Sequence, residues 1–224
     1  MFNYVYNKNL RKLVVAFGSL FDSIYVHHSN PDGGNDLEIR VPITYASQEK
    51  FIRRFLEPSS ITDGVRVETQ LPKISYIMTN ITPDASRRRN RNTPLIKANT
   101  VGNGCSNAGE IITQEIPVNV GFSLFLYTRH IDDTLQIVEQ IMPYFNPDHI
   151  ISMSLTSSTN VNIPITMISN SISEKYDGDF SSRRINISSF NFVAKSYIYG
   201  STQQITTINN IVISGLTAGL NFDL

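Results

Sequence analysis

The feature that most constrains the fold is a long apolar alternation in the middle of the chain. Between residues 116 and 126, apolar side chains occupy every second position. Successive side chains of a strand point to opposite faces, so we predict one long strand over residues 112–127 with one face in a hydrophobic core. The alternating residues are Ile116, Val118, Val120, Phe122, Leu124 and Leu126.

Three other segments have the apolar spacing of helices that cover such a sheet. The first spans residues 10–24, the second follows Ser47 and stops before Pro58, and the third starts near Asp132 and ends before Pro147. Ser47 is a good cap for the second helix, and aspartates stabilise the N-terminal end of the third. The apolar stripes are Leu10, Leu13, Val14, Phe17, Leu20, Phe21 and Ile24; Phe51, Ile52, Phe55 and Leu56; and Leu135, Val138, Ile141, Met142 and Phe145.

Further strands are expected before and after these helices. Two strands flanking a turn-rich segment form a predicted hairpin, a third is kinked by Pro72, and several more fill the last third of the chain. Their predicted ranges are 23–29, 37–43, 65–79, 149–155, 163–173, 184–199 and 204–213. We therefore predict an α+β fold in a single domain over residues 1–224, with a mostly antiparallel β-sheet and two or three helices packed on one face.

The segment from residue 81 to about residue 111 is polar and rich in turn-forming residues. We expect a long exposed loop inserted between strands that contacts a partner, since loops of this length are usually functional. The loop holds a basic run with Arg87, Arg88, Arg89 and Arg91. Three interpretations of this run stay open: a solvated loop, docking to an acidic protein, or contact with nucleic acid. Aromatic residues that would stack on bases do not alternate with these arginines.

The charge balance argues against a general attraction to polyanions. Lys plus Arg and Asp plus Glu each number 19, so no net charge draws the chain to nucleic acid or an anionic membrane. Charged residues make up only 17% of the chain, against about 25% in typical soluble domains. Because interface cores are depleted in charge, this composition favours extensive protein contacts.

The targeting and redox signals are equally sparse. The N-terminus lacks the basic and apolar regions of a secretory signal, and no apolar run is long enough to span a membrane. The single Cys105 excludes an intramolecular disulfide. We expect a soluble protein that folds in a reducing cytoplasm and has no membrane partner.

No pattern in the sequence points to catalysis. The glycine, histidine and serine motifs of nucleotide-binding and hydrolytic sites are absent. His130 and His149 are scattered, and His27 and His28 would point to opposite faces of a strand, which predicts no shared metal. We therefore predict no catalytic residue, no cofactor and no metal site, and a protein that is not an enzyme.

Several segments together resemble a known family. They are residues 1–7, 39–47, 67–72, 177–179 with 182–184, and the longest, 125–145, with the sequence FLYTRHIDDTLQIVEQIMPYF. In these segments the chain resembles the proximal tail sheath stabiliser, or tail terminator, of contractile-tailed bacteriophages. Residues 84–109 and those after 199 match nothing in that family. The stretch 128–133 within the longest segment serves either the fold or a contact surface.

The resemblance implies a structural virion protein at the tail–neck junction, assembled in the host cytoplasm. It implies a homo-hexameric ring at the head-proximal end of the contractile tail, which terminates tube and sheath and joins the tail to the neck. The implied partners are sheath and tube subunits and a neck or head-completion protein, with genome DNA close by in the channel. A ring needs two different patches on each subunit.

We expect arginines to supply some of these subunit or partner contacts. The candidates are Arg87, Arg88, Arg89, Arg91, Arg183 and Arg184. The alternative function is a neck or channel protein that contacts nucleic acid through residues 87–91.

Overall fold

The computed structural model describes ten parts of the chain and divides into two compact units. The described residues are 4, 6–28, 37–56, 71–90, 95–98, 108–112, 115–156, 159–175, 185–200 and 202–206. The larger unit comprises residues 6–88 and 117–198, and the smaller unit comprises residues 1–5, 89–116 and 199–224. The prediction of a single domain over residues 1–224 stays a prediction.

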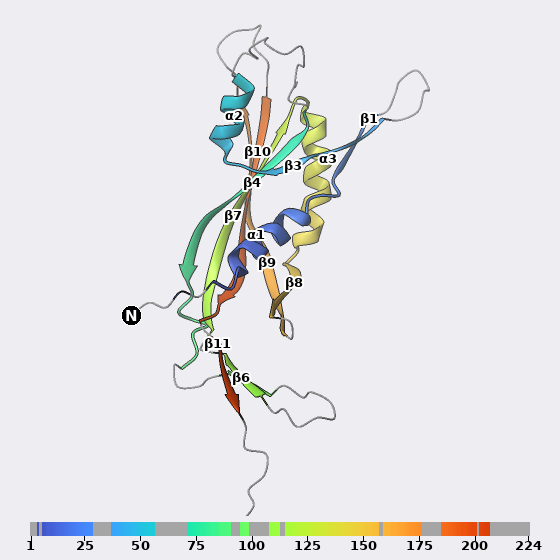
Figure 1. The fold of residues 1–224 in the computed structure, drawn as a ribbon. Coiled ribbons are helices and arrows are strands. Elements are labelled where there is room, and N and C mark those ends of the chain that lie inside the picture. Colours follow the sequence, from blue (N-terminus) through green and yellow to red (C-terminus); the bar gives the residue numbers. More distant parts are fainter. Residues whose placement is uncertain are drawn as a thin grey trace, which may run out of the picture. The chain divides into compact units, whose positions relative to one another are not determined.

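A six-stranded sheet organises the larger unit (Figure 1). In spatial order its strands are β3 (Ile43–Tyr45), β4 (Lys73–Pro83), β7 (Ile116–Thr128), β10 (Ile185–Ile198), β9 (Thr159–Lys175) and β8 (His149–Thr156). β4 pairs antiparallel with β7, and β9 pairs antiparallel with both β10 and β8. The β3–β4 pair is parallel, so the sheet is mixed. The predicted α+β fold is confirmed.

One face of this sheet carries the main hydrophobic core. α1 (Asn9–Ser19), α3 (Ile131–Ile141) and the short 3₁₀ helix η1 (Met142–Phe145) cover it. The alternate residues of β7 from Val118 to Leu126 are buried here, as the alternation predicts. Phe17 of α1 stacks on Phe122 with ring centroids 4.3 Å apart. The first helix ends at Ser19 and not near residue 24, although Phe21 still reaches the core.

The opposite face is covered at one end by α2 (Gln48–Leu56). Phe51 stacks on Tyr127 of β7 at 3.8 Å, and Lys73 Nζ lies 5.6 Å from the Phe51 ring. The Tyr127 hydroxyl is 3.2 Å from Ser75 Oγ, and burial raises the pKa of Tyr127. Leu126 and Tyr127 are successive residues of β7, so their side chains point to opposite faces of the sheet. Two of the three predicted helices, α1 and α3, therefore lie on one face, and α2 lies on the other.

The smaller unit contains a three-stranded antiparallel sheet in the order β11–β6–β5. Its strands are β5 (Leu95–Ala98), β6 (Ala108–Ile112) and β11 (Thr202–Thr206). The segment expected to be a loop over residues 81–111 therefore contains two strands and the end of β4. The partner strand β11 lies far away in sequence, so no local pattern reveals the pairing. Residues 111 and 112 belong to β6, so the long strand begins later than expected, at Ile116.

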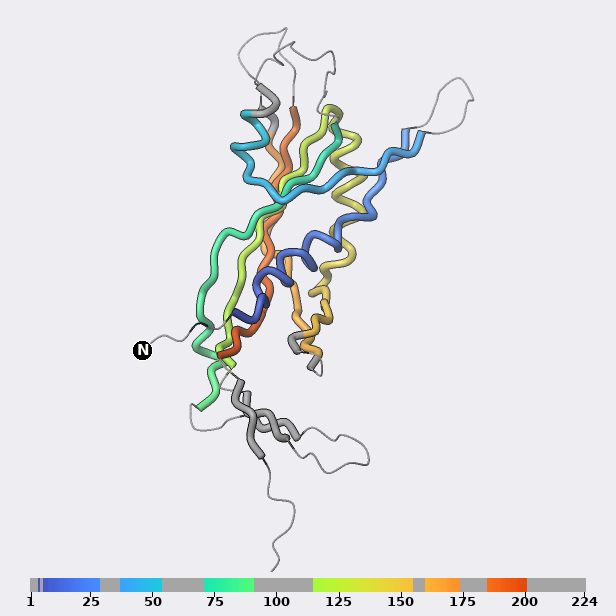
Figure 2. Tube along the Cα trace, viewed as in Figure 1, coloured from blue at the N-terminus to red at the C-terminus, as the bar shows by residue number. Residues whose placement is uncertain are grey.

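The predicted hairpin is confirmed as a two-stranded sheet in the larger unit. β1 (Tyr25–His28) pairs antiparallel with β2 (Leu37–Arg40), with Val26 opposite Ile39. The hairpin extends away from the six-stranded sheet (Figure 2). Its expected turn lies outside the described residues, as do the start of the strand expected from residue 65, Cys105 and the turn at 177–179.

Candidate interaction site

The first candidate region is the basic run, which begins in a tight turn after β4. Asp84 Oδ1 accepts hydrogen bonds from the Ser86 backbone N–H at 3.0 Å and the Ser86 hydroxyl at 2.6 Å. Arg87 Nε donates to Asp84 Oδ2 at 2.7 Å. Aspartate bonding to the backbone two residues ahead is a common way to form a turn. The start of the run is therefore ordered by its own side chains.

Arg87 also reaches two neighbouring strands. Its Nη2 donates to the Val118 carbonyl at 3.2 Å and to Asn119 Oδ1 at 2.8 Å, both in β7. Its guanidinium carbon lies 5.2 Å from the ring centroid of Tyr197 in β10. Only 22% of the Arg87 side chain is exposed. Arg87 thus ties β4, β7 and β10 together inside the larger unit, and we call these contacts the Arg87 brace.

The other predicted arginine contacts fall in three different situations. Arg88 is exposed, and within the described residues its side chain forms no ion pair. In the smaller unit Arg89 Nη1 lies 3.3 Å from Glu115 Oε1. Arg91, Arg183 and Arg184 lie outside the described residues. Partner contact through these arginines stays a prediction, and Arg88 is the described arginine best placed for it.

Titration of the Asp84 carboxyl tests the Arg87 brace. Hydrogen bonds from Ser86 and then from Arg87 hold the pKa of Asp84 well below its usual range. A lowered folded-state pKa means that ionised Asp84 stabilises the fold above about pH 3.9, and this stabilisation is lost as the pH falls through the folded-state pKa. We expect Ser86→Ala to raise the Asp84 pKa towards its ordinary value, as read by NMR titration.

Two further variants complete this prediction. Arg87→Ala removes the second cause of the low pKa and is also expected to raise it. Arg88→Ala removes a neighbouring positive charge without a contact to Asp84, so the pKa should stay low. An unchanged pKa in Ser86→Ala would show that the turn does not form as described.

The second candidate region is an apolar stripe on the outer face of α3 and η1. Ile131 is 44% exposed, Leu135 47% and Met142 44%, and Tyr144 of η1 is 69% exposed. The first three recur at helical spacing on one side of the helix. We call them, with Tyr144, the α3 stripe. Exposed apolar side chains that gather on one side of a helix form a candidate protein contact surface.

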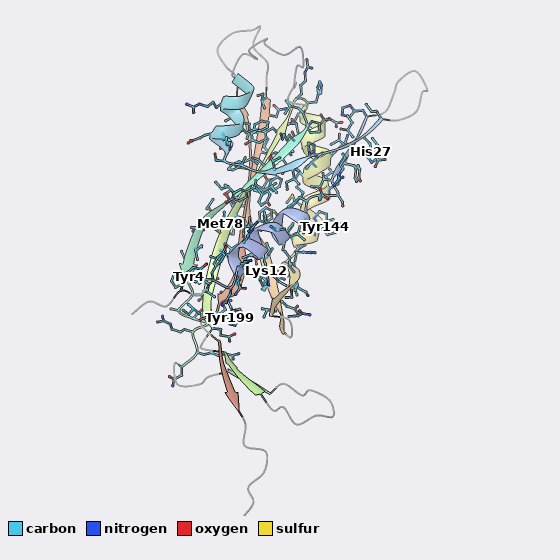
Figure 3. The ribbon with its side chains drawn as sticks, viewed as in Figure 1. Tyr4, Lys12, His27, Met78, Tyr144 and Tyr199 are labelled. Carbon is cyan, nitrogen blue, oxygen red and sulfur yellow. The ribbon has the colours of Figure 1, made fainter. Side chains whose placement is uncertain are left out.

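Charge and shape around the α3 stripe add to this surface. The exposed carboxylates Asp132 and Glu139 border it. Beside it, a cavity of about 510 Å³ has Phe21, Tyr144 and His149 among its lining residues. Figure 3 shows Tyr144 on the α3 side of the larger unit. Such pockets accept anchoring side chains at protein interfaces. Leu135 and Met142 were predicted as core residues, and their outward position is visible only once the register of α3 on the sheet is known.

The histidines contact different carboxylates. His28 Nε2 is 2.8 Å from Asp133 Oδ1, and His27 Nε2 is 4.0 Å from Glu38 Oε1. Asp133 lies in the first turn of α3, as predicted, but its pairing with His28 was not foreseen. In the described part of the chain, no three His, Cys, Asp or Glu side chains gather to hold a metal ion. No helix there is long and apolar enough to cross a membrane.

An exposed apolar stripe with charged residues at its border is a candidate surface for binding other proteins. The chain belongs to the T4-like virus Myoviridae tail sheath stabiliser family, whose model matches residues 4–219. It is 33% identical over 208 residues to the tail completion protein gp15 of Enterobacteria phage T4. This match covers 89% of the chain and 73% of that protein.

The comparisons confirm the resemblance found in the sequence. As a member of this family the chain is a structural protein of the phage tail and a component of the virion. The longest resembling segment, residues 125–145, contains the whole α3 stripe. The matched range runs through residues 84–109 and on to residue 219, so the resemblance extends further along the chain than the sequence segments indicated.

Proposed function

We propose that the chain forms a homo-hexameric ring at the head-proximal end of a contractile tail, where it terminates tube and sheath and joins the tail to the neck. The observation that supports this proposal is the α3 stripe, which lies in the longest segment that resembles the family. Its partners in this proposal are neighbouring copies, tail sheath and tube subunits, and a neck or head-completion protein. The ring is assembled in the host cytoplasm, works without catalysis and lies at the tail–neck junction.

A closed ring requires that one surface of a subunit meets a different surface of the next. The α3 stripe supplies one such surface, with apolar side chains inside and the carboxylates of Asp132 and Glu139 at its border. Arginines on a second surface would complement this border. Arg88 is the candidate within the described residues, and Arg91, Arg183 and Arg184, which lie outside them, stay predictions. Complementary charge at an interface sets orientation and suppresses wrong pairings.

Charge introduced into the α3 stripe tests this proposal. Leu135→Lys and Met142→Lys place a charge where the proposed interface excludes water, so ring formation and attachment to tails should be lost. Both side chains are already about half exposed, so the melting temperature should change little. The measurement is light scattering and electron microscopy of the full chain, alone and with purified tails that lack it.

The matched control is Val15→Lys, because Val15 of α1 is an exposed apolar residue, 62% accessible, outside the stripe. It should form rings and bind tails as the unmodified chain does. Normal rings on tails with both stripe variants would refute the role of α3. A tail-bound assembly of another copy number would refute the hexamer.

The nucleic-acid alternative receives no support from the described contacts. Arg87 is held in the brace and Arg89 pairs with Glu115, so two of the four arginines are engaged within the chain. A DNA-binding run would show a salt slope near −0.9 per phosphate neutralised. Arg88→Ala with Arg91→Ala should leave any weak DNA affinity unchanged if these arginines serve a protein partner.

A further inference from the structure

The β1–β2 hairpin has one edge that is sealed by helix α3. Gln136 accepts a hydrogen bond from the His27 N–H at 3.0 Å and donates one to the His27 carbonyl at 3.1 Å. Gln140 bonds the Tyr25 N–H at 3.4 Å and the Tyr25 carbonyl at 2.7 Å in the same way. Two glutamine amides, one helical turn apart, thus bond alternate residues of β1 as a neighbouring strand would. They fix the hairpin on α3 (His27, Figure 3).

The hydrogen bonds of the hairpin define which backbone groups of β2 point outward. The N–H and C=O of successive strand residues point to opposite sides. The Val41 N–H donates to the Ile24 carbonyl at 2.9 Å, and the register therefore makes Val26 and Ile39 the next pair that bonds β1 to β2. It follows that the backbone groups of Glu38 and Arg40 point away from β1.

The outer edge of β2 is open within the described part of the chain. No third strand joins this two-stranded sheet there. Leu37 lies on the same face of the hairpin as the fully buried Val26, yet it is 58% exposed. The edge therefore combines free N–H and C=O groups with an uncovered apolar side chain, which is a template for another strand.

The N-terminal arm, residues 2–6 with the sequence FNYVY, has the pattern of a strand that lacks a sheet. Its aromatic residues occupy every second position, so an extended arm is aromatic on one side. Tyrosine, phenylalanine and valine all favour strands. Of this arm the structure describes Tyr4 and Tyr6, which are 92% and 57% exposed and belong to no described strand.

The arm does not cover the open edge of its own chain, since Tyr4, Tyr6 and Leu37 are all exposed. Helix α1 begins at Asn9, directly after the arm, and the hairpin follows the other end of this helix. Its 11 residues make α1 about 16 Å long. Figure 3 shows Lys12 of α1 apart from His27 of the hairpin. A second copy is therefore the better source of a strand for this edge.

We propose that the arm of one copy adds as a third strand to β2 of the next copy in the ring. This inference rests on the proposed ring and names one contact that links its neighbours. The arm and the edge are two different surfaces of one subunit, so the contact runs head to tail, as a closed ring requires. Main-chain hydrogen bonds supply affinity in such a pairing, and alternate side chains supply specificity.

The apolar side chains select the register of this pairing. Antiparallel strands form the more stable pair, and with Tyr6 opposite Leu37 both tyrosines of the arm lie on the apolar face of the hairpin. Val5 then lies opposite Glu38, and these two residues exchange both backbone hydrogen bonds because the groups of Glu38 point outward. A shift by one residue would turn the tyrosines to the charged face.

Disulfide cross-linking between copies tests this register in the full chain, with Cys105→Ser as background. Val5→Cys with Glu38→Cys places two thiols across a hydrogen-bonded pair, where Cα atoms about 5.5 Å apart suit a disulfide. Oxidation of assembled rings should give covalent multimers up to the full ring in non-reducing gel electrophoresis. Asn3→Cys with Arg40→Cys, the next hydrogen-bonded pair, should give the same ladder.

Two controls define what a cross-link means. Asn7→Cys with Arg40→Cys would be joined only by a parallel arm, so this pair should stay as single chains. A mixture of the Val5→Cys chain with the Glu38→Cys chain has one thiol per copy and should stop at covalent dimers. All cysteine variants should assemble as the background chain does under reducing conditions.

Removal of the aromatic side chains measures what the arm contributes. Tyr4→Ser with Tyr6→Ser should weaken ring formation about tenfold, read by light scattering as the concentration of half-assembly. The matched control Val15→Ser removes an apolar side chain of α1 that is 62% exposed and lies outside both surfaces. It should assemble as the unmodified chain does, and circular dichroism should show similar melting temperatures for both.

Two outcomes would overturn the arm contact and leave the ring standing. The first is rings that form normally but yield no cross-link from either cysteine pair. The second is an oxidised single chain with an internal disulfide, which would show that the arm lies on its own edge. Absence of rings from the unmodified chain, alone and on tails, is a different result, because it would refute the proposed function together with this contact.

Discussion

Replacing Phe17 by alanine is expected to lower the free energy of unfolding by about 3–5 kcal/mol, the range for deleting a buried aromatic ring. Phe17 is fully buried at the centre of the core. Its ring stacks on Phe122 at 4.3 Å and contacts Phe192 at 5.4 Å, so both α1 and the central strands lose packing. Urea unfolding followed by circular dichroism measures the change.

The control is Val15→Ala, two residues away on the same helix. Val15 is 62% exposed, and alanine has the higher helix propensity, so stability should stay within about 0.5 kcal/mol. If Phe17→Ala cost no more than Val15→Ala, α1 would not lie on the sheet as described.

Adding a side chain at Gly18 is expected to destabilise the fold by about 1–3 kcal/mol, the usual cost of overpacking. A Cβ atom at Gly18 would lie 2.3 Å from the Tyr76 hydroxyl and 2.6 Å from its Cζ. Inside a helix, Gly→Ala normally stabilises by up to about 1 kcal/mol. Gly18→Ala should therefore change stability in the direction opposite to the helix rule, as thermal unfolding would show.

A double-mutant cycle isolates the cause of this effect. Tyr76→Ala removes the atoms that the new methyl would meet, and with them the hydrogen bond from the Tyr76 hydroxyl to the Val14 carbonyl at 3.2 Å. In that background Gly18→Ala should be neutral or stabilising, because only the helix propensity remains. Equal costs in both backgrounds would mean that Tyr76 does not lie over Gly18.

The Arg87 brace stands where the chain passes between its two units. The chain passes between the units after Val5, after Arg88, after Ile116 and after Ile198, and Arg87 lies next to the second of these points along the sequence. In the smaller unit, Glu115 lies 3.3 Å from Arg89 and accepts a hydrogen bond from the Tyr199 hydroxyl at 3.4 Å.

The predictions that were confirmed rest on local patterns. The alternation over residues 116–126 placed the central strand, and helical spacing placed α1, α2 and α3 within a few residues. The hairpin followed from two β-prone runs around a turn-rich segment. These signals work because burial of one face imposes a period on the sequence, and the period can be read without knowing the partner.

The predictions that failed needed the identity of a distant partner. β5 and β6 pair with each other, and β6 pairs with β11, so the pattern over residues 81–111 showed turns but not strands. The contacts of Arg87 also depend on distant residues, because β7 and β10 supply its acceptors and its aromatic neighbour, and its role in partner contact stays a prediction. Helical spacing predicts that Leu135 is a core residue, and its exposure becomes visible only once the rotation of α3 on the sheet is known.

The sequence by itself determined the α+β class, the main strands and helices, and the family to which the chain belongs, because each depends on spacing or identity along the chain. Only the tertiary structure decided which arginine is internal, which apolar residues of α3 face solvent, and which edge of the hairpin is sealed. Those properties depend on side chains far apart in sequence, such as Gln136 and His27, whose meeting no local periodicity encodes.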